Sequence, residues 1–126
     1  MKVTVIFEVA KDGGIWAHTD DKEFKEAFIF GNGQTVEECR EDFMVCYEEV
    51  QEIRDIPTLE FVWKYDIASF FKHYKVLDVT AFAKKINMNA SLMRRYKAGT
   101  PVTEKTYLRI REGIHSVGQE LMTAFM

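Results

Sequence analysis

The sequence predicts an α+β protein in which a βββαβ sheet-plus-helix domain, residues 1–66, precedes an all-α helix-turn-helix domain, residues 67–126. In residues 1–66, apolar residues alternate with polar ones in several short runs, and one long segment between these runs has apolar residues at helical spacing. Residues 67–126 have helical periodicity throughout. Charge divides at the same point. Residues 1–66 carry 16 acidic and 7 basic side chains, a net −9, and residues 67–126 carry 4 and 10, a net +6.

Three short runs with a period of two predict the first strands. Residues 3–9 place valine and phenylalanine on one side and polar side chains on the other, as in a half-buried strand. The Lys-Asp-Gly-Gly cluster at 11–14 is typical of a hairpin turn, so residues 15–19 are expected to form the antiparallel partner. A third strand is expected at 27–30, ended by a turn at 31–33.

After residue 35, the spacing of apolar residues changes from two to three or four, which predicts a long helix. Thr35 and Glu38 have the spacing of a capping box, and the helix should end before Pro57. Residues 59–65 alternate again and predict a fourth strand. The two cysteines of this helix would lie about 10 Å apart, too far for a disulfide, so both are expected to be reduced and buried. The stripe expected to face the sheet comprises Val36, Cys39, Phe43, Cys46, Tyr47, Val50 and Ile53.

The second half contains a series of helix start and stop signals. Asp66 is expected to cap a helix over 67–74. Asp78 is expected to cap a second helix, whose apolar stripe ends at Ile86. Asn89 is a suitable cap for residues 90–98, and Gly99 follows as a stop signal. A last helix is expected to start at Thr100-Pro101.

Composition and charge restrict the class of protein. No apolar run approaches the roughly 20 residues that cross a bilayer, and the N-terminal residues do not resemble a signal peptide, so a cytoplasmic location without membrane contact is expected. The unequal charge of the two halves indicates one part that avoids polyanions and one that can bind them. Chance segregation of solvated charges remains an alternative.

Two short helices joined by a tight turn, of which the second exposes basic and small polar residues, form the unit that places a recognition helix in the DNA major groove. In residues 90–98, Leu92, Met93 and Tyr96 can face inward. Ala90, Ser91, Arg94 and Arg95 then face solvent. Arginine can donate two hydrogen bonds to a guanine edge, and a small residue lets the helix approach the bases.

The basic side chains around this helix are candidates for phosphate contacts, which set register and salt dependence but not sequence choice. A basic, solvated helix of an interaction domain is the alternative interpretation. The expected DNA-binding residues are Asn89, Ala90, Ser91, Arg94, Arg95, Lys84, Lys97 and Lys105, and Lys85 lies beside them in the sequence.

Other chemistry has little support in the sequence. The three histidines are scattered, and neither a Cys-x-x-Cys pair nor a glycine-rich phosphate loop occurs, so no metal, cofactor or catalytic residue is expected, and the chain is not expected to be an enzyme. Carboxylates could converge at a sheet edge to bind Mg²⁺ for phosphodiester hydrolysis, but most should be solvated loop charges. The candidates for such a site are Glu8, Asp12, Asp20, Asp21 and Glu26.

The order of these segments resembles a known family. The turn at 12–14, the strands around it and the Gly-Gln-Thr-Val-Glu-Glu-Cys string at 33–39 are similar to HicB-like antitoxins, whose domain is a partial ribonuclease-H-like fold. Residues 82–99 resemble the helix-turn-helix of lambda-repressor-like regulators. Asn87 stands where those regulators usually have glycine, and asparagine tolerates the left-handed conformation.

The resemblance implies a non-catalytic antitoxin of a type II toxin-antitoxin pair. Its N-terminal domain would cover a HicA-type mRNA-cleaving toxin, through residues that the sequence does not identify, while its C-terminal domain represses the shared operon at operator DNA as a homodimer or higher oligomer. Two other hypotheses remain. One is a stand-alone transcription regulator with a ligand-sensing or dimerising N-terminal domain. The other is a metal-dependent nuclease with Glu8 and Asp12 as ligands.

Overall fold

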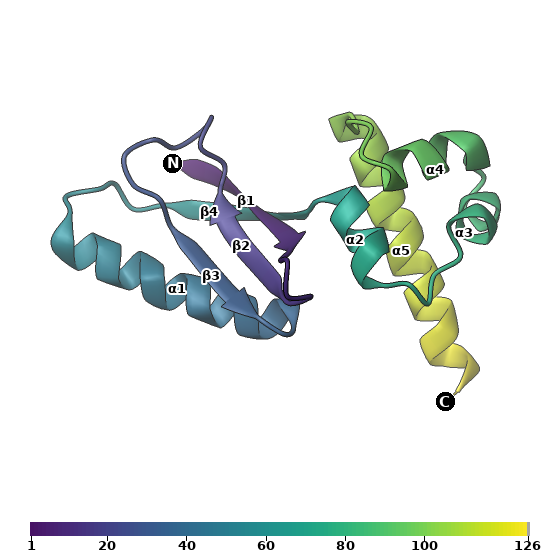
Figure 1. The fold of residues 1–126 in the computed structure, drawn as a ribbon, viewed down its shortest axis with the longest axis horizontal. Coiled ribbons are helices and arrows are strands. Elements are labelled where there is room, and N and C mark those ends of the chain that lie inside the picture. Colours follow the sequence, from purple (N-terminus) through teal and green to yellow (C-terminus); the bar gives the residue numbers. More distant parts are fainter. Residues whose placement is uncertain (126) are drawn as a thin grey trace. The chain divides into compact units, whose positions relative to one another are not determined.

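The computed structural model describes residues 1–125 and shows an α+β fold with a four-stranded mixed sheet and five helices among those residues (Figure 1). The chain forms two compact units, Met1–Tyr74 and Lys75–Met126. The first unit contains the sheet and two helices, and the second is helical. In the described residues, no helix is both long enough and apolar enough to span a membrane.

The sheet has the strand order β3-β2-β1-β4. β1 (Lys2–Val9) and β2 (Ile15–Thr19) form the expected antiparallel hairpin. β3 (Phe30–Gly33) pairs antiparallel with β2, while β4 (Glu60–Tyr65) pairs in parallel with β1, which makes the sheet mixed. The two central strands are therefore the first two in the sequence.

The hairpin turn between β1 and β2 is confirmed. Gly13 has φ 88°, a left-handed conformation that glycine adopts at little cost. The Asp12 carboxylate accepts a hydrogen bond from the Gly14 amide at 3.0 Å, and the Ala10 amide donates to the Gly14 carbonyl at 2.7 Å. Local chemistry thus determines this turn.

The third strand lies later in the sequence than expected, because residues 31–33 belong to β3 and are not a turn. The two glycines of this segment allow a helix to lie directly on the strand. A Cβ added at Gly31 would lie 2.3 Å from the Phe43 amide nitrogen, and one added at Gly33 would lie 2.6 Å from the Cys39 amide nitrogen. The turn-like composition of the segment therefore reflects close packing.

That helix is α1 (Val36–Ile53), which covers one face of the sheet (Figure 1). Its cap is the one expected: the Thr35 hydroxyl accepts from the Glu38 amide at 3.1 Å, and the Glu38 carboxylate accepts from the Gln34 amide at 2.9 Å. The helix buries Cys39, Phe43 and Tyr47. Cys46 is only partly buried, and Ile53, expected in the stripe, is 81% exposed because the last turn extends beyond the strands' apolar face.

Aromatic rings join α1 to β4. The Phe43 ring meets the rings of Phe61 and Trp63 edge to face, with centroids 5.0 and 5.2 Å apart. Phe61 and Trp63 therefore lie on the helix side of the sheet, next to the fully buried Val3 and Val5 of β1. After β4, Asp66 caps α2 (Ile67–His73), which completes the first unit.

The second unit comprises α3 (Val79–Lys85), α4 (Ala90–Lys97) and α5 (Glu104–Ala124). Their caps are Asp78, Asn89 and Thr103. The first two caps were expected, but α5 starts four residues after Thr100. The reason is local: the Thr103 hydroxyl accepts from the Thr106 amide at 3.3 Å, and the residues before it lie outside the helix.

Candidate nucleic-acid interface

The turn between α3 and α4, residues 86–89, is anchored on both sides. Within residues 1–125, Asn87 is the one non-glycine residue with positive φ, at 58°. Its carbonyl accepts a hydrogen bond from Arg109 of α5 at 2.7 Å, and the Met88 amide donates to the Ala83 carbonyl at 2.8 Å. The direction in which α4 leaves the turn is therefore determined by α3 and α5 together.

Both ends of α4 carry the expected signals. The Asn89 side chain accepts from the Leu92 amide at 2.9 Å. At the other end, Gly99 has φ 114°, its amide donates to the Tyr96 carbonyl at 3.1 Å, and the Thr100 amide donates to the Arg95 carbonyl at 3.0 Å. These two bonds form a Schellman motif, in which a glycine ends the helix.

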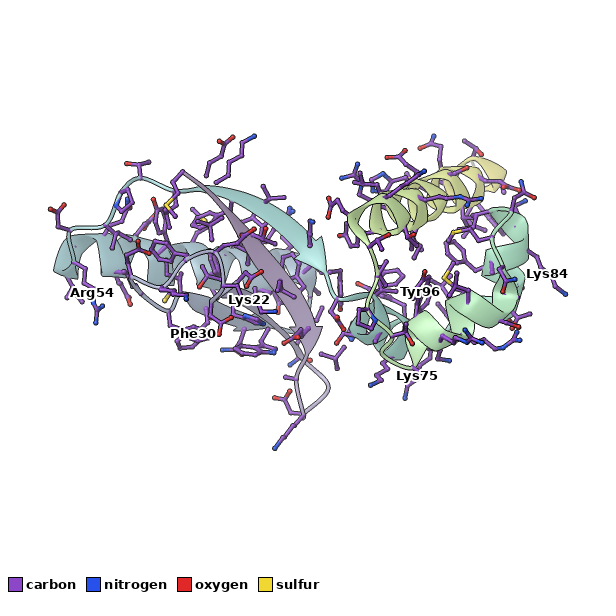
Figure 2. The ribbon with its side chains drawn as sticks, turned by 90° about the horizontal axis from the view of Figure 1, so that it is seen from above. Lys22, Phe30, Arg54, Lys75, Lys84 and Tyr96 are labelled. Atoms are coloured by element: carbon purple, nitrogen blue, oxygen red, sulfur yellow. The ribbon has the colours of Figure 1, made fainter. Side chains whose placement is uncertain are left out.

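The inner face of α4 is narrower than expected. Met93 is fully buried and Tyr96 is 7% exposed, whereas Leu92, expected to face inward, is 36% exposed. Successive helical residues point about 100° apart, so a buried seam formed by Met93 and Tyr96 directs Leu92 toward one flank of the helix. Figure 2 labels Tyr96, whose ring lies among the helices of this unit.

The outer face presents Ser91, Arg94 and Arg95, all exposed, beside the partly buried Ala90. Arg94 is ordered by neighbours that carry no charge. Its Nη1 donates to the Thr80 hydroxyl of α3 at 3.0 Å, and its Nη2 donates to the Ser91 hydroxyl at 3.0 Å. A guanidinium has five N–H donors, so these contacts orient the group and leave its positive charge uncompensated.

Sequence reasoning missed Thr80. The contact joins residues that are 14 positions apart across the turn, and the helical pattern of α3 does not distinguish a threonine that contacts α4 from one that faces solvent. Arg109 was missed for the same reason, because its partner lies 22 positions earlier. No signal in a single sequence identifies either contact.

The other expected basic residues lie on three elements. Lys84 is in the last turn of α3, Lys97 in the last turn of α4 and Lys105 in the first turn of α5, and all three are exposed. Lys84 extends away from the unit in Figure 2. Within residues 1–125, none of the three forms an ion pair, in contrast to Lys85, whose Nζ lies 3.0 Å from Glu120.

The second unit is basic. Residues 75–126 hold 9 basic and 4 acidic side chains, a net +5. Two of the acids, Glu112 and Glu120, are in ion pairs with Arg111 and Lys85. α4 itself contains no acidic residue. Its outer face is thus a positively charged surface whose central side chain, Arg94, is already ordered.

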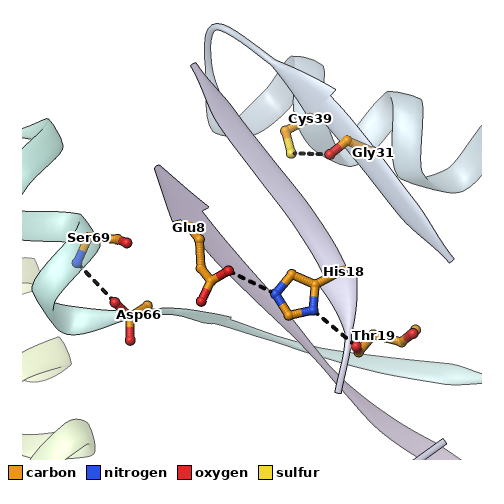
Figure 3. Close-up of polar contacts among 7 residues, drawn as sticks. All are labelled: Glu8, His18, Thr19, Gly31, Cys39, Asp66 and Ser69. Atoms are coloured by element: carbon orange, nitrogen blue, oxygen red, sulfur yellow. Dashed lines mark hydrogen bonds and ion pairs between the residues drawn. The ribbon is translucent and has the colours of Figure 1, made fainter. Parts of the chain in front are cut away.

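Four of the five carboxylates considered for magnesium accept hydrogen bonds elsewhere. Glu8 accepts from the His18 ring at 3.0 Å (Figure 3), and Asp12 accepts within the hairpin turn. Among residues 1–125, no group of three or more His, Cys, Asp or Glu side chains could bind a metal ion.

Both cysteines are free. Cys39 donates its thiol to the Gly31 carbonyl at 3.4 Å (Figure 3). Burial, with a smaller contribution from the nearby charge of Asp42, raises the pKa of the Cys39 thiol from 9.0 to about 11. Burial also raises the pKa of Tyr65. Both shifts keep these groups neutral near pH 7, as expected for packed core residues.

Comparison of the chain with protein-family models, with curated proteins and with solved structures found no match.

Proposed function

We propose that the second unit binds duplex DNA as a helix-turn-helix, with α4 as the recognition helix. The observation that carries this proposal is the Arg94 side chain, which is ordered by two hydroxyl groups on an exposed face that contains no acid. A purely structural arginine would more often be paired with a carboxylate. An ordered and unneutralised guanidinium is suited to a bidentate contact with a guanine edge or a phosphate.

The dimensions of α4 suit the major groove. Its eight residues extend about 12 Å, and the groove is about 12 Å wide. Ser91, Arg94 and Arg95 would contact base edges, and Ala90 would allow close approach. Lys84, Lys97 and Lys105 would contact phosphates, which positions the protein and makes binding depend on salt.

The first unit has the opposite charge and a separate core. Residues 1–74 hold 16 acidic and 8 basic side chains, a net −8, so this unit repels a polyanion and attracts a cationic protein. Together with the resemblance to HicB-like antitoxins, this supports the proposal that the chain is the antitoxin and autorepressor of a toxin-antitoxin pair. The first unit would neutralise a basic, HicA-type toxin, and the second would repress the operon at its operator.

DNA binding is tested with the Arg94→Ala, Arg95→Ala double variant in gel shifts with the region upstream of the chain's own gene, at physiological salt. We expect loss of binding by roughly 30-fold or more, because two base contacts are removed and each good one contributes about 1–3 kcal/mol. Lys75→Ala with Arg111→Ala is the matched control: it removes two cations from the same unit, outside α4. Equal binding by the Arg94/Arg95 variant and wild type would exclude α4 as the recognition helix.

The antitoxin role is tested separately. Any small basic protein encoded next to this chain is expressed alone, with the wild type, and with the Arg94/Arg95 variant. We expect toxicity alone, rescue by both forms, and co-purification of both with the toxin, because neutralisation belongs to the first unit. If no such neighbour exists, or if it is harmless, the stand-alone regulator becomes the better interpretation and the DNA-binding proposal is unaffected.

A further inference from the structure

The two arginines of α4 differ in their contacts, although they are neighbours in the sequence and both are exposed. Arg94 donates from Nη1 to the Thr80 hydroxyl of α3 and from Nη2 to the Ser91 hydroxyl, each at 3.0 Å. Among residues 1–125, the Arg95 side chain has no hydrogen-bond or ion-pair partner. A hydrogen bond on each terminal nitrogen restricts rotation of the guanidinium, so Arg94 alone presents its remaining N–H groups in a defined direction.

The Thr80 hydroxyl is held in place by the packing of α3. Thr80 is partly buried, in the first turn of α3, which is capped by Asp78. α3 and α4 pack against each other, and Ala83 of α3 and Met93 of α4 are both fully buried. Thr80 is therefore a fixed point on a second helix, against which the guanidinium of Arg94 is aligned.

The contact between Thr80 and Arg94 has little to contribute to folding. Arg94 is exposed, so water can replace the Thr80 hydroxyl as an acceptor at small cost in stability. The hydroxyl carries no charge and does not neutralise the guanidinium. What the contact changes is the orientation of the guanidinium before any partner binds. A side chain that is already oriented loses less conformational entropy when it forms an interface.

The remaining donors of Arg94 define the kind of acceptor that it can bind. Two of its five N–H groups are used, and the group has no acceptor of its own. In the major groove, guanine alone presents two acceptors, N7 and O6. Adenine and cytosine present an amino group there, and thymine has one acceptor beside a methyl group. An oriented guanidinium can therefore distinguish guanine from the other bases, whereas a phosphate attracts any nearby cation, oriented or mobile.

We propose that Thr80 is a specificity-determining residue, whose hydroxyl aligns Arg94 to bind a guanine edge in the major groove instead of a phosphate. Thr80 acts through Arg94 and is a positioning residue. This proposal rests on the proposed function of α4 as a recognition helix, and it names the base and the residue that selects it. Without the hydroxyl, Arg94 keeps its charge and its attraction to DNA but loses part of its ability to discriminate among bases.

Selection from a pool of duplexes with a randomised central segment tests the proposal, because it requires no knowledge of the operator. The full chain is used as wild type, Thr80→Val and Thr80→Ser. Valine has the branched shape of threonine without the hydroxyl, and serine keeps the hydroxyl. We expect the wild type to enrich a motif that contains a guanine, and Thr80→Val to lose roughly 3- to 10-fold of the preference for it, the range for ordering one flexible side chain. Thr80→Ser should retain most of the preference.

Two measurements separate alignment of Arg94 from a structural role. Affinity for an unselected duplex, and its dependence on salt, should not change in Thr80→Val, because no cation is removed. In an Arg94→Ala background, Thr80→Val should have no further effect on the guanine preference, because the side chain that it aligns is absent.

The matched control is Thr123→Val, which removes a hydroxyl from the last turn of α5 and should select the same motif as the wild type. Circular dichroism melts identify the variants that fold. Thr80→Ala, which also removes the hydroxyl, carries the test if Thr80→Val does not fold.

Several outcomes would overturn the proposal while leaving the recognition helix in place. They are an unchanged guanine preference in Thr80→Val, a selected motif without guanine, and a further loss in the Arg94→Ala background. Equal weakening on selected and unselected duplexes would mean that Thr80 itself contacts a phosphate. A wild type that enriches no motif would contradict the proposed DNA-binding function, and the role of Thr80 with it.

Discussion

Each unit places a glycine where a helix meets a neighbouring element, but the two glycines face different atoms. A Cβ at Gly31 would lie 2.3 Å from the Phe43 amide nitrogen and 2.7 Å from the Cys39 carbonyl oxygen, both backbone atoms of α1. A Cβ at Gly113 would lie 2.8 and 2.9 Å from methyl carbons of Ile86, a flexible side chain. Backbone cannot move without displacing the helix, whereas a side chain can change rotamer. The first unit should therefore tolerate less change at its helix contact than the second.

Gly31→Ala should cause the largest loss. We expect the free energy of unfolding of the first unit to fall by roughly 3 kcal/mol or more, because α1 must lift from β3. Urea unfolding followed by tryptophan fluorescence measures this, since both tryptophans lie in the first unit. Gly118→Ala is the control: its Cβ meets nothing within 4 Å, and it should stabilise α5 by up to about 1 kcal/mol. An unchanged midpoint for Gly31→Ala would mean that α1 and β3 are not in close contact.

The reactivity of the Cys39 thiol reports on the contact between α1 and β3 without a substitution at that contact. A thiol whose pKa is raised from 9.0 to about 11 carries about 100-fold less thiolate at pH 8. In a Cys46→Ser variant, iodoacetamide should therefore label Cys39 at least 100-fold more slowly in the native state than in urea. The protonated thiol is favoured in the folded state, so its contribution to stability is present below pH 9 and is lost as pH rises toward 11. Equal labelling rates would contradict the buried position of Cys39.

Gly113→Ala should have a smaller effect, a loss of about 1 kcal/mol, because Ile86 can move and the new alanine favours the helix. Helical circular dichroism follows its unfolding, with tryptophan fluorescence recording the first unit in parallel. Ile86→Val, which removes one of the crowded methyl groups, should recover part of the loss in a double-mutant cycle. A loss as large as that of Gly31→Ala would remove the distinction between the two contacts.

The smallest change in stability is expected for substitutions at Asn87, in the turn between α3 and α4. Its φ of 58° costs a residue with an ordinary side chain about 1 kcal/mol, whereas glycine adopts it freely. We expect Asn87→Ala to lower the melting temperature of the second unit and Asn87→Gly to leave it unchanged or slightly raise it. If alanine and glycine melted alike, the positive φ would not contribute to the stability of this turn.

The elements that the sequence predicted well are those defined by neighbouring residues. Thr35, Asp78 and Asn89 each cap the helix expected, because a cap requires only a side chain and an amide two or three positions later. β3 was misplaced because Gly31 was interpreted as a turn residue, although its role is set by a helix that starts later in the sequence. Close packing between elements leaves no local signature.

In the candidate interface, too, local features were predicted from the sequence and contacts between elements were not. The exposed positions of Ser91, Arg94 and Arg95 followed from helical periodicity alone. The inward placement of Leu92 was wrong, because the width of the buried seam depends on how α3 and α5 surround α4. The Thr80 contact, which orders Arg94, depends on the angle between two helices, and periodicity within one helix cannot supply that angle.

The parallel pairing of β1 with β4 has a consequence for how the first unit forms. β3 and α1 are adjacent in the chain, so their contact closes a short loop at low entropic cost, whereas Lys2 must meet Glu60, 58 positions later. During synthesis, β1 can pair with β2 at once but lacks a neighbour on its other edge until β4 has emerged. We therefore expect α1 and the β1–β2–β3 segment to associate early, and the addition of β4 to be the slow step that completes the sheet.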